Sequence, residues 1–135
     1  MPSSGPQLFL FLLILAAIIT LACGSPPSPA RILQTVNISP PSADGQAQFT
    51  ALGFYEPPYP VPVVLTATWG ACYQKAPTTE VTVSSAGFAQ CGVGASGTYT
   101  VFGSAPSGAN VCPDVLASCG GGGCQVAGTA QLTCP

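Results

Sequence analysis

Residues 63–69 of the 135-residue chain read Val-Val-Leu-Thr-Ala-Thr-Trp, and this stretch decides the fold class. In an extended strand, one face would carry Val63, Leu65, Ala67 and Trp69, and the other Val64, Thr66 and Thr68. Such period-2 alternation is typical of a β-strand with one buried face. No stretch after residue 30 shows the sustained apolar spacing of an amphipathic helix. The sequence therefore predicts an all-β domain.

Similar alternation, or short β-branched runs bounded by turn residues, recurs on both sides of this stretch. The predicted strands cover residues 32–39, 46–55, 63–69, 81–83, 88–91, 98–103 and 125–134. About seven short antiparallel strands in about 105 residues are the number and size expected of an immunoglobulin-like β-sandwich. In such sandwiches a tryptophan is often buried between the sheets. We expect Trp69 to be a core residue of this kind.

Several of these segments, taken in order, resemble the bacterial immunoglobulin-like (Big) domain. The matching segments are Leu33 to Pro40, QAQFTALG at 46–53, LTATW at 65–69, VTVSSAGFAQC at 81–91 and GTYTV at 97–101. The resemblance covers residues 31 to about 103. It implies a structural or adhesive module of a bacterial surface protein, with no shared catalytic residues to carry over. The six cysteines after residue 30 and a Cys/Gly-rich insert at 105–124 depart from that family's usual pattern.

The charge content excludes several classes of function. Only 4% of residues are charged and there is no histidine, whereas an average soluble domain carries about 25% charged residues. The two cations, Arg31 and Lys75, cannot neutralise the roughly 6 to 10 phosphates of a typical nucleic-acid site. Imidazole-based catalysis and imidazole metal sites are excluded as well. We expect no nucleic-acid partner, no cofactor and no enzymatic activity.

The N-terminal segment is typical of export. An unbroken apolar run from Leu8 to Ile19 is too short to span a bilayer and suits a signal peptide, so residues 1–22 are interpreted as a targeting segment. Thr20-Leu21-Ala22-Cys23 resembles a bacterial lipobox, which implies lipidation of Cys23 and a Pro/Ser-rich tether at 23–30. Cleavage after Ala22 or Gly24 by an ordinary signal peptidase and an uncleaved anchor are the alternatives.

The cysteine count supports this interpretation. Seven cysteines would leave one unpaired thiol in an oxidising compartment, and lipidation or removal of Cys23 leaves six. The disulfide candidates are Cys72, Cys91, Cys112, Cys119, Cys124 and Cys134. Their spacing contains no C-x-x-C pair, which favours disulfides over a zinc site. We expect Cys72 to pair with Cys91 because each lies just past a strand end, and the other four to join the insert to the final strand.

Other motifs have simpler interpretations. Gly92 to Gly97 fits G-x-G-x-x-G, but a strand and not a helix is expected to follow, so the motif is interpreted as a glycine-rich turn and not a dinucleotide site. The carboxylates Asp44, Glu56, Glu80 and Asp114 are expected in separate loops and turns. An enzyme of unfamiliar type would need Lys75 beside two carboxylates, or a free thiol of low pKa.

One loop is a candidate binding surface. Residues 54–60 read Phe-Tyr-Glu-Pro-Pro-Tyr-Pro, and aromatic side chains on a proline-stiffened loop offer contact area at low entropic cost. Phe54, Tyr55 and Tyr59 are the residues of this possible binding loop. The alternative is a strand connection whose aromatic side chains cover the end of the sandwich.

These observations together predict an exported, non-enzymatic immunoglobulin-like module of the bacterial cell envelope. Its expected partners are a membrane, through a lipid anchor on Cys23, and an unidentified protein or glycan. The alternative is a freely secreted, disulfide-rich binding protein or inhibitor that uses the loops at 54–62 and 105–124.

Overall fold

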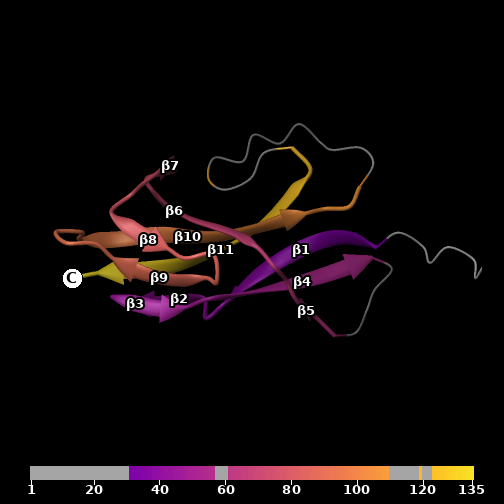
Figure 1. The fold of residues 1–135 in the computed structure, drawn as a ribbon, viewed down its shortest axis with the longest axis horizontal. Helices are drawn as coiled ribbons and strands as arrows, with labels where there is room; N and C mark the ends of the chain where they lie inside the picture. The colour runs from indigo at the N-terminus through magenta and orange to yellow at the C-terminus, as the bar shows by residue number, and fades with distance from the viewer. Residues whose placement is uncertain (1–30, 57–60, 110–118, 120–122) are drawn as a thin grey trace, which may run out of the picture.

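The computed structural model describes residues 31–56, 61–109, 119 and 123–135, and all regular structure in these ranges is β-strand. The first strands are β1 (Ile32–Ser39), β2 (Ser42–Asp44), β3 (Gln46–Gln48), β4 (Thr50–Glu56), β5 (Val63–Val64) and β6 (Thr68–Tyr73). They are followed by β7 (Ala76–Pro77), β8 (Val81–Val83), β9 (Phe88–Cys91), β10 (Gly97–Pro106) and β11 (Gln125–Cys134). The prediction of an all-β domain is confirmed (Figure 1).

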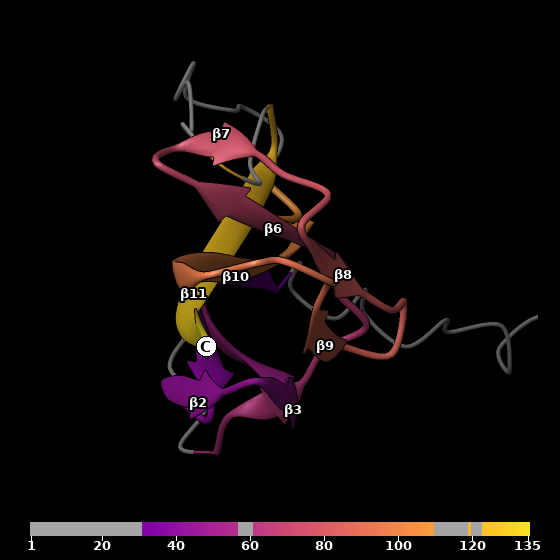
Figure 2. The same cartoon turned by 90° about the vertical axis from the view of Figure 1, so that its left-hand side faces the viewer.

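The strands form one large and two small sheets. The large sheet has the order β2-β11-β10-β6-β7, and the small sheets have the orders β1-β4-β5 and β3-β9-β8. All pairs are antiparallel except β2 with β11, which is parallel. In Figure 2 the large sheet runs from β7 at the top to β2 at the bottom, with β8, β9 and β3 opposite it. The arrangement is sandwich-like.

The longest strands follow the alternation that predicts them. In β11 the side chains of Ala130 and Leu132 are buried, whereas Gln131 and Thr133 are exposed. β10 pairs with β11 over its whole length, from Gly97 opposite Cys134 to Pro106 opposite Gln125. A β-sheet with one dry face and one wet face needs this pattern, and here threonine and glutamine supply the wet face. β10 also includes Ala105 and Pro106, the first two residues of the predicted insert.

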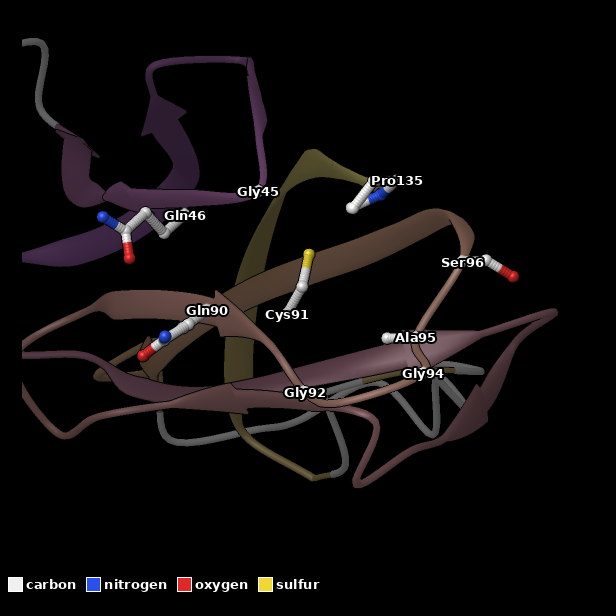
Figure 3. A pocket seen from close by; sticks show the side chains of 9 residues that line it. All are labelled: Gly45, Gln46, Gln90, Cys91, Gly92, Gly94, Ala95, Ser96 and Pro135. Atoms are coloured by element: carbon white, nitrogen blue, oxygen red, sulfur yellow. The ribbon is translucent and has the colours of Figure 1, made fainter.

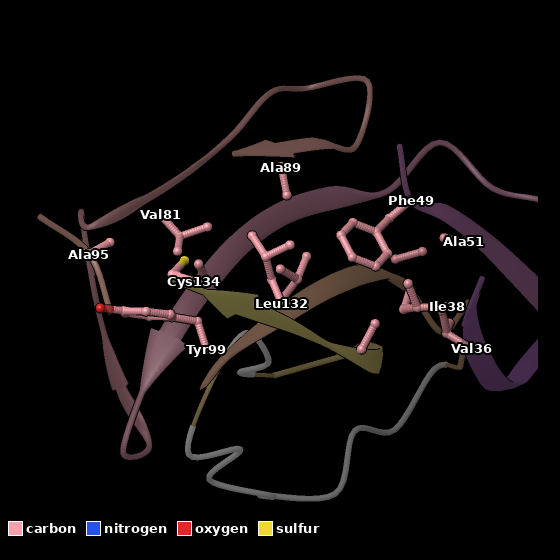
Figure 4. Packing of buried hydrophobic residues seen from close by; sticks show 14 of the residues in the cluster. Val36, Ile38, Phe49, Ala51, Val81, Ala89, Ala95, Tyr99, Leu132 and Cys134 are labelled. Carbon is pink, nitrogen blue, oxygen red and sulfur yellow. The ribbon is translucent and has the colours of Figure 1, made fainter. Parts of the chain in front are cut away.

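The core lies between the sheets (Figure 4). Its largest fully buried side chains are Tyr99, Phe49, Leu33, Leu132 and Val101. Many of the remaining core positions are alanines: Ala51, Ala71, Ala89, Ala95, Ala105 and Ala130. Because these side chains are small, the opposing sheets meet over little apolar volume.

Two predicted strands are divided in the structure. The stretch at 46–55 is interrupted at Phe49, a buried residue whose backbone N–H donates to the carbonyl of Gly87 at 2.9 Å. The stretch at 63–69 splits into β5, which pairs with β4, and β6, which pairs with β10. The chain changes sheets between them, and the backbone N–H of Leu65 donates to the carbonyl of Ala51 at 2.9 Å. Three of the four residues of the predicted face, Leu65, Ala67 and Trp69, pack against the core, whereas Val63 is 42% exposed.

Trp69 is half-buried and packs over two glycines. A Cβ atom added at Gly103 would lie 2.9 Å from the Trp69 ring, and one at Gly87 would lie 2.9 Å from its other side. Gly103 pairs directly with Trp69 across β10 and β6. The indole therefore fits only because both neighbouring positions lack a side chain.

We expect Gly103→Ala to lower the free energy of unfolding by about 1–3 kcal/mol, because the added methyl overpacks the indole. Thr98→Ala, an exposed change in the same strand, is the matched control, with an expected effect within about 0.5 kcal/mol. Urea unfolding followed by tryptophan fluorescence measures both. Equal stability of the two variants would show that Trp69 has room to move.

Candidate functional site

An open pocket of about 470 Å³ lies at the end of the molecule that holds Pro135 (Figure 3). Nine residues line it: Gly45, Gln46, Gln90, Cys91, Gly92, Gly94, Ala95, Ser96 and Pro135. They come from Gly45 and the start of β3, from the end of β9 and the turn that follows it, and from the residue after β11. Three parts of the chain that are distant in sequence therefore meet at this pocket.

The turn at Gly45 builds one wall of the pocket. Its N–H donates to the carbonyl of Thr133 at 2.8 Å, and its carbonyl accepts from the N–H of Cys91 at 2.9 Å. Gly45 has a φ of 68°, a left-handed conformation that glycine adopts without strain. These two hydrogen bonds join β2 and β3 to both β11 and β9. They also bring the exposed amide side chains of Gln46 and Gln90 opposite each other, as partners in the β3–β9 register.

The glycine-rich turn at 92–97 builds the facing wall. The N–H of Gly92 donates to the carbonyl of Glu80, and the N–H of Ala95 donates to the carbonyl of Gly92. The residues that follow form β10 and not a helix. The interpretation of this G-x-G-x-x-G string as a turn between strands is confirmed. Without a following helix, the turn has no helix dipole to bind a pyrophosphate.

A disulfide between Cys91 and Cys134 lies at the pocket, and the sulfur of Cys91 points toward Pro135 in Figure 3. The bridge joins the end of β9 to the end of β11 and thus links two sheets. Cys134 belongs to the buried face of β11, together with Leu132 and Ala130. The disulfide is therefore continuous with the core.

The predicted pairing of Cys72 with Cys91 is wrong, because Cys72 is joined to Cys119. Neighbouring residues of a strand point to opposite faces. Since Ala71 packs into the core, Cys72 points away from it, on the outer face of β6. Cys72 is nevertheless fully buried. Cys124 is also disulfide-bonded, so the disulfide prediction is confirmed for five cysteines, and Cys112 lies outside the described residues.

Tyr99 forms a polar contact beside the glycine-rich turn. Its hydroxyl donates to Glu80 Oε2 at 2.6 Å, and its ring lies 5.0 Å from the ring of Tyr73, centroid to centroid. The hydrogen bond to Glu80 raises the pKa of Tyr99, and desolvation of its 2% exposed side chain adds to the effect. A backbone hydrogen bond from Ser96 to the hydroxyl lowers this pKa and offsets part of the increase.

This shift makes stability depend on pH in the alkaline range. A tyrosine whose pKa is higher in the folded state contributes stability below its unfolded pKa of about 10 and loses it as pH rises through the folded pKa. We expect the free energy of unfolding to fall above about pH 10 and this fall to be smaller in Tyr99→Phe. Tyr73→Phe keeps the bond to Glu80 and removes only the smallest of the causes that raise this pKa, so it should retain most of the decrease. Identical alkaline profiles for Tyr99→Phe and the unmodified protein would contradict the assignment.

The predicted binding loop is only partly described. Phe54 is 37% exposed near the end of β4, whereas Tyr55 is half-buried against the core, and Tyr59 lies outside the described residues. Glu56 accepts a hydrogen bond of 3.0 Å from the side chain of Gln34. The structure thus separates Phe54 from Tyr55, because consecutive residues of β4 face opposite sides of the sheet.

The charged residues lie on separate elements. Asp44 ends β2, Glu56 ends β4, and Lys75 lies in the turn between β6 and β7. Asp114 is outside the described residues. Within the described ranges there is no group of three or more Cys, Asp or Glu side chains that could hold a metal ion. The same ranges contain no helix long and apolar enough to cross a membrane.

The side chains that line the pocket are neutral: two amides, one hydroxyl, a cystine sulfur, a proline ring and an alanine methyl, with glycine backbone between them. Such a surface can exchange hydrogen bonds with uncharged polar groups such as hydroxyls and amides. Sequence analysis identified its glycine-rich turn but missed Gln46, Gln90 and Pro135. The pairing of Gln46 with Gln90 depends on the β3–β9 register, which local pattern does not indicate.

A scan of the chain against models of known protein families found no match, and a search of curated proteins found no similar sequence.

Proposed function

We propose that this chain is an immunoglobulin-like β-sandwich that acts outside the cytoplasm as a non-enzymatic interaction module of the bacterial cell envelope. Lipid on Cys23 anchors it to a membrane, and the pocket at its opposite end receives an uncharged protein or glycan group. The observation that carries this proposal is the placement of the two ends. β1 begins at one end of the molecule, and the pocket with Pro135 lies at the other (Figure 1).

The strand order supports an immunoglobulin-like fold. Only Phe49 separates β3 from β4, so β3 and β4 can be considered one interrupted strand. The two small sheets then become one sheet, in which this strand lies between β1 and β9, and β8 follows β9. In an immunoglobulin constant-type domain, strands A, B, E and D form one such sheet, and C, F and G form the other. Here β6, β10 and β11 occupy the places of C, F and G.

Two side chains agree with this assignment. Trp69 lies on β6, the equivalent of strand C, where many such domains carry a core tryptophan. Tyr99 lies near the start of β10, the equivalent of strand F, and its hydroxyl interacts with the backbone of Ser96, three residues earlier. A tyrosine that bonds back to the preceding backbone at this corner is a recurrent feature of such sandwiches.

The disulfides support a location outside the cytoplasm, because cystines persist mainly in oxidising compartments. The neutral side chains of the pocket support binding over catalysis. Its lining side chains offer hydrogen bonds but no acid, base or strong nucleophile, which are the groups that catalysis by protein side chains usually requires.

The anchor is tested by expressing the full chain in a bacterium and fractionating the cells. We expect the protein in the membrane fraction, with a diacylglyceryl group on Cys23 in the intact mass, and we expect Cys23→Ser to lose both. Ser25→Ala is the matched control, because it changes a nearby small residue and leaves the lipobox intact. A soluble mature chain that begins at Ser25 would contradict the anchor and favour the secreted binding protein.

A further inference from the structure

Exposed apolar side chains gather on one sheet of the domain. Of the eight large apolar residues that are exposed in the described part of the chain, three lie on the outer side of the β1-β4-β5 sheet: Ile32, Phe54 and Val64. Val61 precedes β5, and Val63 pairs with Gly53 on the core side of the sheet. Val61 and Val64 are each 69% exposed. Single exposed apolar residues are ordinary, but a gathering on one sheet indicates a contact surface.

Strand register places three apolar side chains on the outer face of this sheet. Leu52 lies directly opposite Val64, and Phe54 follows Leu52 by two residues, so all three point to the same side. The buried positions of β4, Ala51 and Gly53, lie on the other side of the sheet, toward the core. Leu52, Phe54 and Val64 are called the outer apolar face below.

This face lies on the sheet through which the N-terminal segment enters the domain. β1 begins at Ile32, which pairs with Glu56 at the end of β4. Figure 1 shows this end of the sheet away from the C-terminus. The eight residues from Cys23 to Ala30 span at most about 28 Å when fully extended. A lipid on Cys23 would therefore hold the sheet within that distance of the bilayer.

We propose that the outer apolar face of the β1-β4-β5 sheet rests on the bilayer surface, with Phe54 and Val64 at the boundary between headgroups and acyl chains. This inference depends on the lipid anchor of the proposed function. The tether supplies a high effective concentration of bilayer, so a small apolar face is sufficient. The chain has only two cations and a net charge of -2. Binding is therefore apolar and does not require anionic lipid.

The proposal is tested with the full lipidated protein in phosphatidylcholine vesicles, by hydrogen–deuterium exchange. Amides of β4 and β5 should exchange several-fold more slowly than in the unlipidated Cys23→Ser protein, and added salt should not change this. Val64→Asp should abolish the protection, because it places a carboxylate on the outer apolar face. The variant should still fold, since the side chain of Val64 is 69% exposed and supports little packing. Val93→Asp is the matched control: Val93 is fully exposed on the glycine-rich turn near the pocket, and its replacement should leave the protection intact.

The possible failures are distinguishable. If mass spectrometry shows lipid on Cys23 but β4 and β5 exchange as fast as in the unlipidated protein, the anchor is correct and the docking is wrong. Protection that appears in the unlipidated protein as its concentration rises would assign the face to a second copy and overturn the proposal. Absence of lipid on Cys23 would overturn both the anchor and the docking.

Discussion

The disulfide between Cys91 and Cys134 joins the β3-β9-β8 sheet to the five-stranded sheet, and the rest of the domain depends on that link. Many of the residues between the sheets are alanines, so the apolar surface buried on folding is modest. Charge pairing contributes little in a chain with 4% charged residues. A covalent bridge across the sheets compensates by restricting the unfolded chain over a separation of 43 residues.

The same link shapes the pocket. Cys91 and Pro135 both line it, and Cys134 is the last residue of β11, directly before Pro135. Gly45 hydrogen-bonds to Thr133 and to Cys91, the two segments that the bridge connects. The backbone contacts and the disulfide thus hold the same three segments. In this way the constraint that stabilises the fold also fixes the geometry of its candidate binding site.

Local pattern predicted much of this structure but not the pairing of distant segments. The bounds of β1, β8, β9 and β11 match the predicted strands, because each has alternating or β-branched residues between clear turn signals. The split at 63–69 was missed, since alternation continues while the chain changes sheets. The cysteine pairing was missed for a related reason. Whether Cys72 faces the core or the outside depends on the register of β6 against β10.

Local pattern likewise predicts one part of the candidate site, the glycine-rich turn, but not the strand pairing that completes it. The glycine-rich turn at 92–97 is visible in the sequence, and its role as a strand connection followed from the apolar alternation after it. Gln46 and Gln90 are ordinary surface residues of two strands, and only their pairing makes them part of one pocket. The aromatic composition of residues 54 and 55 predicts a shared binding loop, yet Phe54 and Tyr55 face opposite sides of β4.

The most direct test is the free energy of unfolding of the Cys91→Ala, Cys134→Ala double variant, measured by urea denaturation beside the unmodified protein. If the bridge compensates for a core of small side chains, its removal should cost about 4 kcal/mol, as expected for a closed loop of this length. A loss below about 1 kcal/mol would show that packing and backbone hydrogen bonds hold the sheets together without the bridge, and would contradict the account.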